Sequence, residues 1–140
     1  MRTFLGILSA AAAALALAGC GHLDLTPEGD PSRVVTGQVE IGEDVALPAD
    51  TVVTVRVEDT SGIGMPPQVL GSQTIKNPGV APVPFRVEFM AEDEVLRRGL
   101  DIEVRVSIGG KVRYYNENHH VVTLGNAGEA HRITVSPVGP

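Results

Sequence analysis

The sequence predicts an all-β fold: a single antiparallel β-sandwich of seven or eight short strands with one short helical turn, following a cleaved signal peptide. Three observations support this prediction. Apolar and polar residues alternate along much of the 140-residue chain, which is typical of strands with one buried and one solvated face. Turn-forming glycines and prolines separate these runs. An uncharged apolar run precedes the one cysteine, Cys20. A small β-barrel is the alternative architecture.

Residues 1–19 have the layout of a bacterial lipoprotein signal peptide. Arg2 is followed by residues 4–18, none of which is charged, and a Leu-Ala-Gly-Cys lipobox then ends in Gly19 and Cys20. We expect cleavage between Gly19 and Cys20, a diacylglycerol on the Cys20 sulfur, and an N-acyl chain such as palmitate on the new amine. A transmembrane helix is the alternative, but it needs roughly 20 apolar residues and this run is shorter.

Lipidation at Cys20 would also determine where the protein resides. Two or three acyl chains hold a protein on a bilayer essentially permanently, whereas one chain gives only reversible binding. Gly21 follows the cysteine, in place of the aspartate that retains enteric lipoproteins in the inner membrane. We therefore expect a lipid-anchored protein of the outer membrane that faces the periplasm. Residues 20–32 are predicted to be the lipidated N-terminus with a flexible tether, and residues 33–140 the folded domain.

The strands are predicted from their alternation and from the turns between them. In chain order they are residues 34–41, 53–58, 69–75, 85–89, 102–108, 111–114, 120–124 and 132–136. Gly109 and Gly110 predict a two-residue hairpin, because both central positions of such a turn favour positive φ. Residues 91–98 predict the helical turn. Pro82 and Pro84 predict that the strand they enter lies at a sheet edge, because proline donates no ladder hydrogen bond.

Three histidines are the first candidates for metal ligands. His119, His120 and His131 lie on neighbouring predicted strands. Adjacent residues of a strand point to opposite faces, so His119 and His120 do not readily share one ion. No cysteine and no evident carboxylate completes a ligand set. We therefore predict no metal site and expect these histidines to be exposed at strand ends.

The other candidates for chemistry also have simpler structural interpretations. The acidic run at residues 92–94 is typical of the first turn of a helix. Gly110 and Lys111 resemble the end of a phosphate loop but lack its other residues, and Ser72 lacks the frame of a nucleophile elbow. Tyr115 is predicted to face outward alone, which is little support for a glycan site. We expect no catalytic residue, no cofactor besides the covalent lipid, and no enzymatic activity.

The charge balance argues against two classes of partner. The formal net charge is −6, and acidic and basic residues are interspersed. Nucleic acid requires a clustered basic face, and a polybasic membrane-binding surface requires the same. We expect the charges to maintain solubility.

Two stretches are similar to a known family, the YbaY/YscW-like lipoprotein domain. Residues 47–61, LPADTVVTVRVEDTS, resemble the start of that domain. Residues 69–75, VLGSQTI, with the Asn-Pro-Gly at 77–79 and the Pro-Val-Pro-Phe at 82–85, resemble its next part. The resemblance runs from about residue 37 to residue 135. It implies a small β-sandwich on a lipid anchor, and it implies no catalytic residues.

The same resemblance suggests two functions. Some relatives are pilotins, which bind the tail of an outer-membrane secretin, escort it to the membrane and help it assemble, whereas the YbaY-like relatives have no established activity. We expect a non-enzymatic outer-membrane lipoprotein that acts as a periplasmic binding or assembly module. A secretin pilotin is the alternative, and a glycan-binding or glycan-active protein is the third and least supported interpretation. The expected partners are the membrane, through the lipid, and an envelope client such as a secretin, with no nucleic acid.

Overall fold

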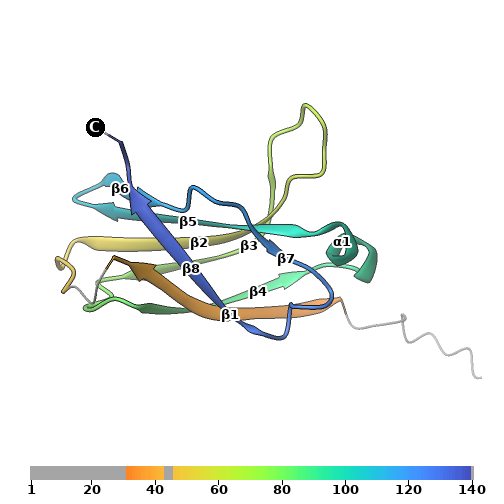
Figure 1. Ribbon diagram of the computed structural model, residues 1–140, viewed down its shortest axis with the longest axis horizontal. Helices are drawn as coiled ribbons and strands as arrows, with labels where there is room; N and C mark the ends of the chain where they lie inside the picture. The colour runs from red at the N-terminus through yellow and green to blue at the C-terminus, as the bar shows by residue number, and fades with distance from the viewer. Residues whose placement is uncertain (1–30, 43–45, 140) are drawn as a thin grey trace, which may run out of the picture.

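The computed structural model describes residues 31–42 and 46–139, which form eight strands and one short helix (Figure 1). The elements are β1 (Ser32–Ile41), β2 (Thr51–Asp59), β3 (Gln68–Lys76), β4 (Val83–Met90), α1 (Asp93–Arg98), β5 (Leu100–Ile108), β6 (Lys111–Tyr115), β7 (His120–Val122) and β8 (Ala130–Pro137). The predicted all-β class and the position of each strand are confirmed. The helix begins two residues later than the predicted run, after Glu92 in extended conformation.

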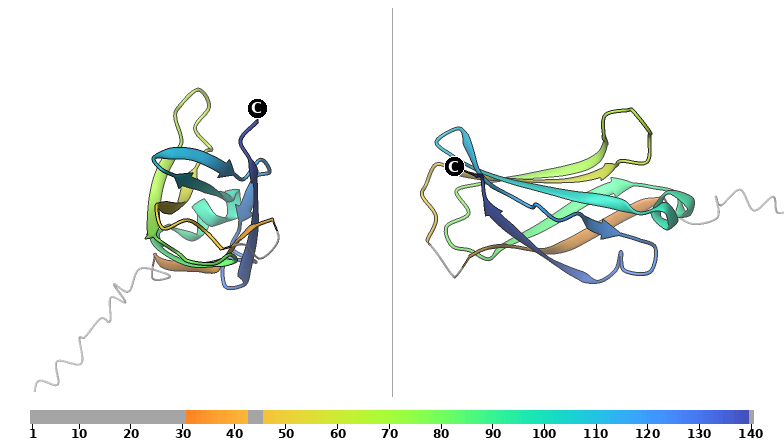
Figure 2. Two further views of the ribbon diagram at one scale, coloured as in Figure 1. Left: turned by 90° about the vertical axis from the view of Figure 1, so that its left-hand side faces the viewer. Right: turned by 45° about the horizontal axis from the view of Figure 1, so that its top comes forward.

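The strands form one rolled sheet, so the predicted sandwich is wrong and the alternative barrel is the better description. The order is β3-β2-β5-β6-β8-β1-β4, with β7 paired to β5 beside this path. Seen end-on, the strands form a nearly closed ring (Figure 2). The predicted antiparallel arrangement also has one exception, because β1 and β8 pair in parallel. Alternation tells which face of a strand is buried, but it does not tell which strands pair.

The ring closes where the edge strands β3 and β4 meet. A Cβ atom on Gly71 of β3 would lie 2.3 Å from the Glu88 carbonyl oxygen of β4 and 2.9 Å from the Cβ of Phe89. Nearby, the Arg86 backbone N–H donates to Oε1 of Gln73 across 2.7 Å. The two edges are therefore joined by close packing at a glycine and by a side-chain hydrogen bond. As the two prolines predicted, β4 is an edge strand, whose ladder runs only along β1.

The interior of the barrel is filled by alternate side chains of the strands. Leu96 of α1 is fully buried and covers one end. The buried apolar residues are Val35, Val39, Ile41, Val53, Val55, Val57, Ala81, Val83, Phe85, Val87, Phe89, Ala91, Leu96, Leu100, Ile102, Val104, Val106, Val122, Ile133 and Val135. A barrel of about eight strands has an interior just wide enough for side chains to fill. A binding surface on this domain is therefore to be sought on its outside.

One inward position of the predicted pattern is wrong. Alternation over residues 111–114 places Val112 and Tyr114 on the same, buried side, but Val112 is 42% exposed. The Gly109 and Gly110 hairpin forms as predicted, with φ of 61° and 82°. The β5–β6 register then shifts between Val106 and Ser107. Such an irregularity changes which face the following side chains occupy. Tyr114 still packs against the core, and Val112 does not.

Replacing Gly71 with alanine should strongly destabilise the barrel. The new methyl group meets the backbone of β4 rather than a flexible side chain, so the two edges must separate. We expect a loss of about 1–3 kcal/mol in the free energy of unfolding. Urea denaturation of residues 31–140 measures it. Gly128→Ala is the control, because nothing lies within 4 Å of its Cβ position. Equal stability of the two variants would contradict closure at Gly71.

Candidate functional site

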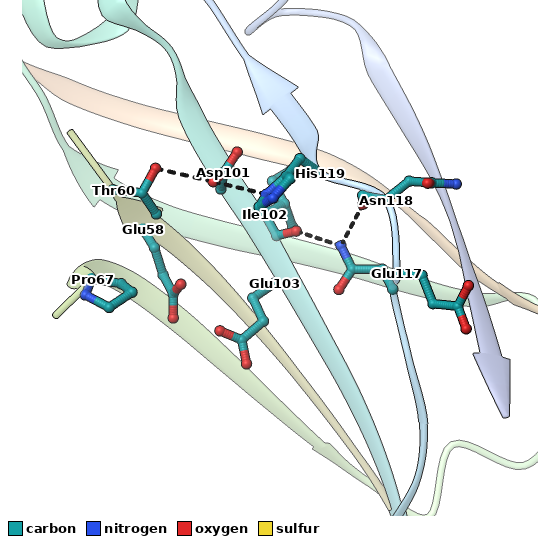
Figure 3. A pocket seen from close by; sticks show the side chains of 10 residues that line it. Glu58, Thr60, Pro67, Asp101, Ile102, Glu103, Glu117, Asn118 and His119 are labelled. Atoms are coloured by element: carbon teal, nitrogen blue, oxygen red, sulfur yellow. Dashed lines mark hydrogen bonds and ion pairs between the residues drawn. The ribbon is translucent and has the colours of Figure 1, made fainter. Parts of the chain in front are cut away.

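A polar hollow lies on the outer face of the barrel, across β5. Its volume is about 230 Å³. Glu58 and Thr60 reach it from the end of β2, and Asp101 and Glu103 reach it from β5 (Figure 3). Pro67, at the start of β3, forms one side. We call this site the outer hollow.

The far wall of the outer hollow is the connection between β6 and β7, held in place by Asn116. The Val104 N–H donates to Oδ1 of Asn116 across 2.8 Å, and Nδ2 of Asn116 donates to the Ile102 carbonyl across 2.7 Å. The side-chain amide thus makes the hydrogen bonds to β5 that the backbone of a neighbouring strand would otherwise make. This lets residues 117–119 leave the sheet between β6 and β7, where they line the hollow.

Two of the acidic side chains in the outer hollow have partners. The Thr60 hydroxyl donates to Oδ2 of Asp101 across 3.1 Å, and Nδ1 of His119 lies 3.3 Å from the same oxygen. Glu103 forms an ion pair with Arg105. Each of these carboxylates therefore has a donor in the folded protein. That donor partly offsets the free-energy cost of removing the carboxylate from water.

Glu58 has no such compensation. It is 5% exposed, and none of the ion pairs in the described chain includes it. Its carboxyl and that of Glu103 point into the same space (Figure 3). Burial first, and then the neighbouring carboxyl of Glu103, raise the pKa of Glu58 from 4.5 to about 7, against the opposing charges of Arg56 and Arg105. Near neutral pH Glu58 thus holds a proton that a cation could replace.

A short loop with an apolar tip rises beside the outer hollow. It connects β2 to β3 and projects from the barrel in Figure 1. Ile63 is fully exposed and Met65 is 70% exposed. A second hollow of about 470 Å³ lies along this loop and shares Pro67 with the outer hollow. Met65 lines this second hollow, and Pro67 is the lining residue that the two hollows have in common.

A pair of histidines lies on the other side of β5, inside the barrel. Nε2 of His120 and Nδ1 of His131 are 2.8 Å apart, across the gap between β7 and β8. His131 is 5% exposed, and its Nε2 has no partner within the described residues. Burial, and then the charge of His131, lower the pKa of His120. The expectation of exposed histidines is therefore wrong for His131, because β8 directs it into the core.

The predicted separation of the neighbouring histidines is confirmed. His119 faces outward to Asp101, and its side chain is 83% exposed, while His120 faces His131. Among residues 31–42 and 46–139, no group of three or more His, Cys, Asp and Glu residues could hold a metal ion. The two facing ring nitrogens of the histidine pair hydrogen-bond to each other instead.

The remaining candidates from the sequence do not converge on a site. Glu92 precedes α1, and the two acidic residues after it lie in its first turn, where they suit the helix dipole. Tyr115 is 39% exposed on β6. Ser72 lies exposed on β3, and Lys111 starts β6 after the hairpin. Gly19 and Cys20 lie outside the described residues. In the part of the chain that the structure describes, no helix is long and apolar enough to cross a membrane.

Sequence reasoning missed Glu58 and the loop. Alternation along β2 predicts that Glu58 faces outward, and outward residues are usually solvated. A register shift between Val57 and Glu58 interrupts the β2–β3 ladder there, and Pro67 then lines the space beside the carboxyl. The available signal was the presence of Ile63 and Met65 between glycines and prolines, where a loop would ordinarily be polar.

The fold is a small β-barrel domain with an acidic hollow on its outer face. A model of the type III secretion system lipoprotein chaperone family (YscW) matches residues 30–135. The chain therefore belongs to this family. Since the family is one of chaperones, the protein is not an enzyme, as the sequence predicted.

A solved structure agrees with this assignment. An alternative pilotin from the type II secretion system of Vibrio cholerae is similar to this chain, with a TM-score of 0.65 and 25% sequence identity. The similarity covers 78% of this chain and 99% of that one. No curated protein matches the sequence. The two comparisons name different secretion systems, and both describe proteins that serve secretion.

Replacing Glu58 with glutamine should change how stability depends on pH. The raised pKa means that the folded protein keeps a proton that the unfolded chain releases between pH 4.5 and about 7. The wild type therefore loses stability as pH rises through this window. Glu58→Gln should remove that loss. The free energy of unfolding of the variant, taken relative to that of the wild type, should therefore be about 1–3 kcal/mol higher at pH 8 than at pH 4. Urea denaturation across pH measures this difference. Glu129→Gln, which changes an exposed acid, is the matched control. A difference for Glu58→Gln that does not change with pH would contradict the account.

The histidine pair predicts a loss of stability in acid. Because the pKa of His120 is lowered in the folded state, the unfolded chain binds more protons, and stability falls as pH drops below about 6.5. His120→Gln should flatten the thermal stability profile between pH 8 and pH 5, and exposed His119→Gln should not. An unchanged profile in His120→Gln would contradict the lowered pKa of His120.

Proposed function

We propose that the protein is a pilotin, a lipoprotein chaperone that binds a secretin subunit and delivers it to the outer membrane. The family match over residues 30–135 carries the proposal. The similarity to a type II pilotin over nearly all of that chain supports it. These findings favour the alternative drawn from the sequence over the broader reading of an envelope-binding module.

The anchor we propose is a lipid on Cys20, which would hold the barrel close to the membrane. The twelve residues from Cys20 to Pro31 can span at most about 40 Å. The Ala91 N–H donates to the Pro31 carbonyl across 2.9 Å, and Arg33 forms an ion pair with Asp93. The chain therefore enters β1 at the α1 end of the barrel. The outer hollow opens beside the same end, because Glu58 and Asp101 lie where β2 ends and β5 begins.

A soluble barrel can bind its client without a lipid, but it cannot carry the client to a membrane. A client held beside the α1 end would be brought within tether length of the bilayer. The anchor and the barrel thus have separable tasks under this proposal. The exposed Tyr115 alone gives no comparable support for glycan binding.

Replacing Cys20 with alanine should separate these two tasks. The variant should fold and bind a secretin, but lose its lipid and leave the secretin out of the outer membrane. Membrane fractionation of the native host with immunoblotting of the secretin, and palmitate labelling, measure both effects. Thr26→Ala, which keeps the cysteine, is the matched control. Palmitate on Cys20→Ala would refute the anchor.

Co-purification tests the chaperone function directly. The full-length lipoprotein is isolated from detergent-solubilised membranes of its host, and its partners are identified by mass spectrometry. We expect a secretin, whose recovery is lost when its C-terminal tail is removed. Recovery of other envelope proteins without a secretin would contradict the pilotin function.

A further inference from the structure

The β2–β3 loop is fixed to the barrel, although its tip is exposed. The Ser61 N–H donates to Oδ1 of Asp59 across 2.9 Å, and the Met65 N–H donates to the Gly62 carbonyl across 3.2 Å. The Thr60 hydroxyl bonds Asp101 of β5. The Ser61 hydroxyl and N–H lower the pKa of Asp59, so the base of the loop stays charged. The tip with Ile63 and Met65 is thus presented at a defined place.

The outer hollow at the base of this loop is lined by acidic rather than basic residues, and Arg56 and Arg105 are the cations near its carboxyls. Four of the residues lining the outer hollow are carboxylic acids, Glu58, Asp101, Glu103 and Glu117, and none is lysine or arginine. In Figure 3 the carboxyls of Glu58 and Glu103 point into the same space next to Pro67. The acidic hollow therefore lies at the base of the loop whose tip carries Ile63 and Met65.

We propose that the outer hollow and the loop tip together form the client-docking surface, and that they take a client segment carrying a lysine or arginine flanked by apolar residues. The inference rests on the proposed pilotin function and adds where the client binds and what chemistry it must bring. The cation would enter the hollow at Glu58. The flanking apolar residues would cover Ile63 and Met65.

Charge complementarity selects this occupant. Asp101 already has Thr60 and His119, and Glu103 already has Arg105. Glu117 is exposed to water, so Glu58 is the buried carboxyl that a new cation would satisfy. An incoming cation takes the place of the proton on Glu58, and that proton passes to solvent. Burying the exposed Ile63 and Met65 supplies the hydrophobic part of the affinity. An anionic bilayer fits less well, because the carboxylates would repel it.

The test measures secretin recovered per lipoprotein, using full-length proteins co-purified from host membranes in detergent at pH 8. Glu58→Gln should lower recovery about tenfold, as expected for loss of a charged hydrogen-bond partner. Met65→Asp should lower it similarly. The matched controls are Glu129→Gln, in the β7–β8 connection, and Met90→Asp, on β4, which change an exposed acid and an exposed methionine elsewhere. Thermal unfolding of each variant verifies that it is folded.

A pH series distinguishes client binding from a structural effect. Wild-type recovery should rise between pH 6 and pH 8 as Glu58 gives up its proton, and recovery with Glu58→Gln should not. Recovery that is unchanged in Glu58→Gln and Met65→Asp would overturn the docking surface while leaving the pilotin function intact. If the loop tip contacted the bilayer and not the client, secretin recovery with Met65→Asp would also be unchanged. Absence of any secretin from the wild-type sample would instead contradict the proposed function itself.

Discussion

The contact between β3 and β4 at Gly71 is the constraint on which the rest of the structure depends. The β3 and β4 edges share no backbone ladder, so without this contact the rolled sheet would open between them. The described domain contains no cysteine, so no disulfide can hold the edges together. Closure instead relies on the absence of a side chain at Gly71 and on the valine-rich interior. Because side chains fill that interior, the polar residues that can meet a partner are those on the outside.

Closure also explains why the acidic residues gather where they do. The register shift at Val57 and Glu58 lies directly opposite Gly71 in the β2–β3 ladder. Val57 of β2 pairs with Gly71, the residue of β3 that contacts β4, and Glu58 follows Val57 directly. The loop that follows carries Ile63 and Met65 and returns through Pro67 to the outer hollow. The fold therefore places an incompletely paired carboxyl and an apolar tip together at the end where the chain enters β1.

Local patterns in the sequence predict the elements well and their assembly poorly. Alternation located the strands, the two glycines gave the β5–β6 hairpin, and strand geometry separated His119 from His120. The parallel pairing of β1 and β8 and the closure of the barrel depend on residues far apart in the chain, which no local pattern encodes. The exposure of Val112 and the burial of Glu58 both follow register shifts. The site was missed for the same reason, since its residues come from the end of β2, the start of β3, β5 and the β6–β7 connection.

The most direct test of this account is a structure of the full-length lipoprotein bound to the C-terminal segment of its secretin. The account predicts that the segment lies on the outer face across β5, with a lysine or arginine within hydrogen-bonding distance of Glu58 and apolar residues over Ile63 and Met65. A segment bound along β1 and β4, or one that opens the barrel to reach its interior, would contradict it.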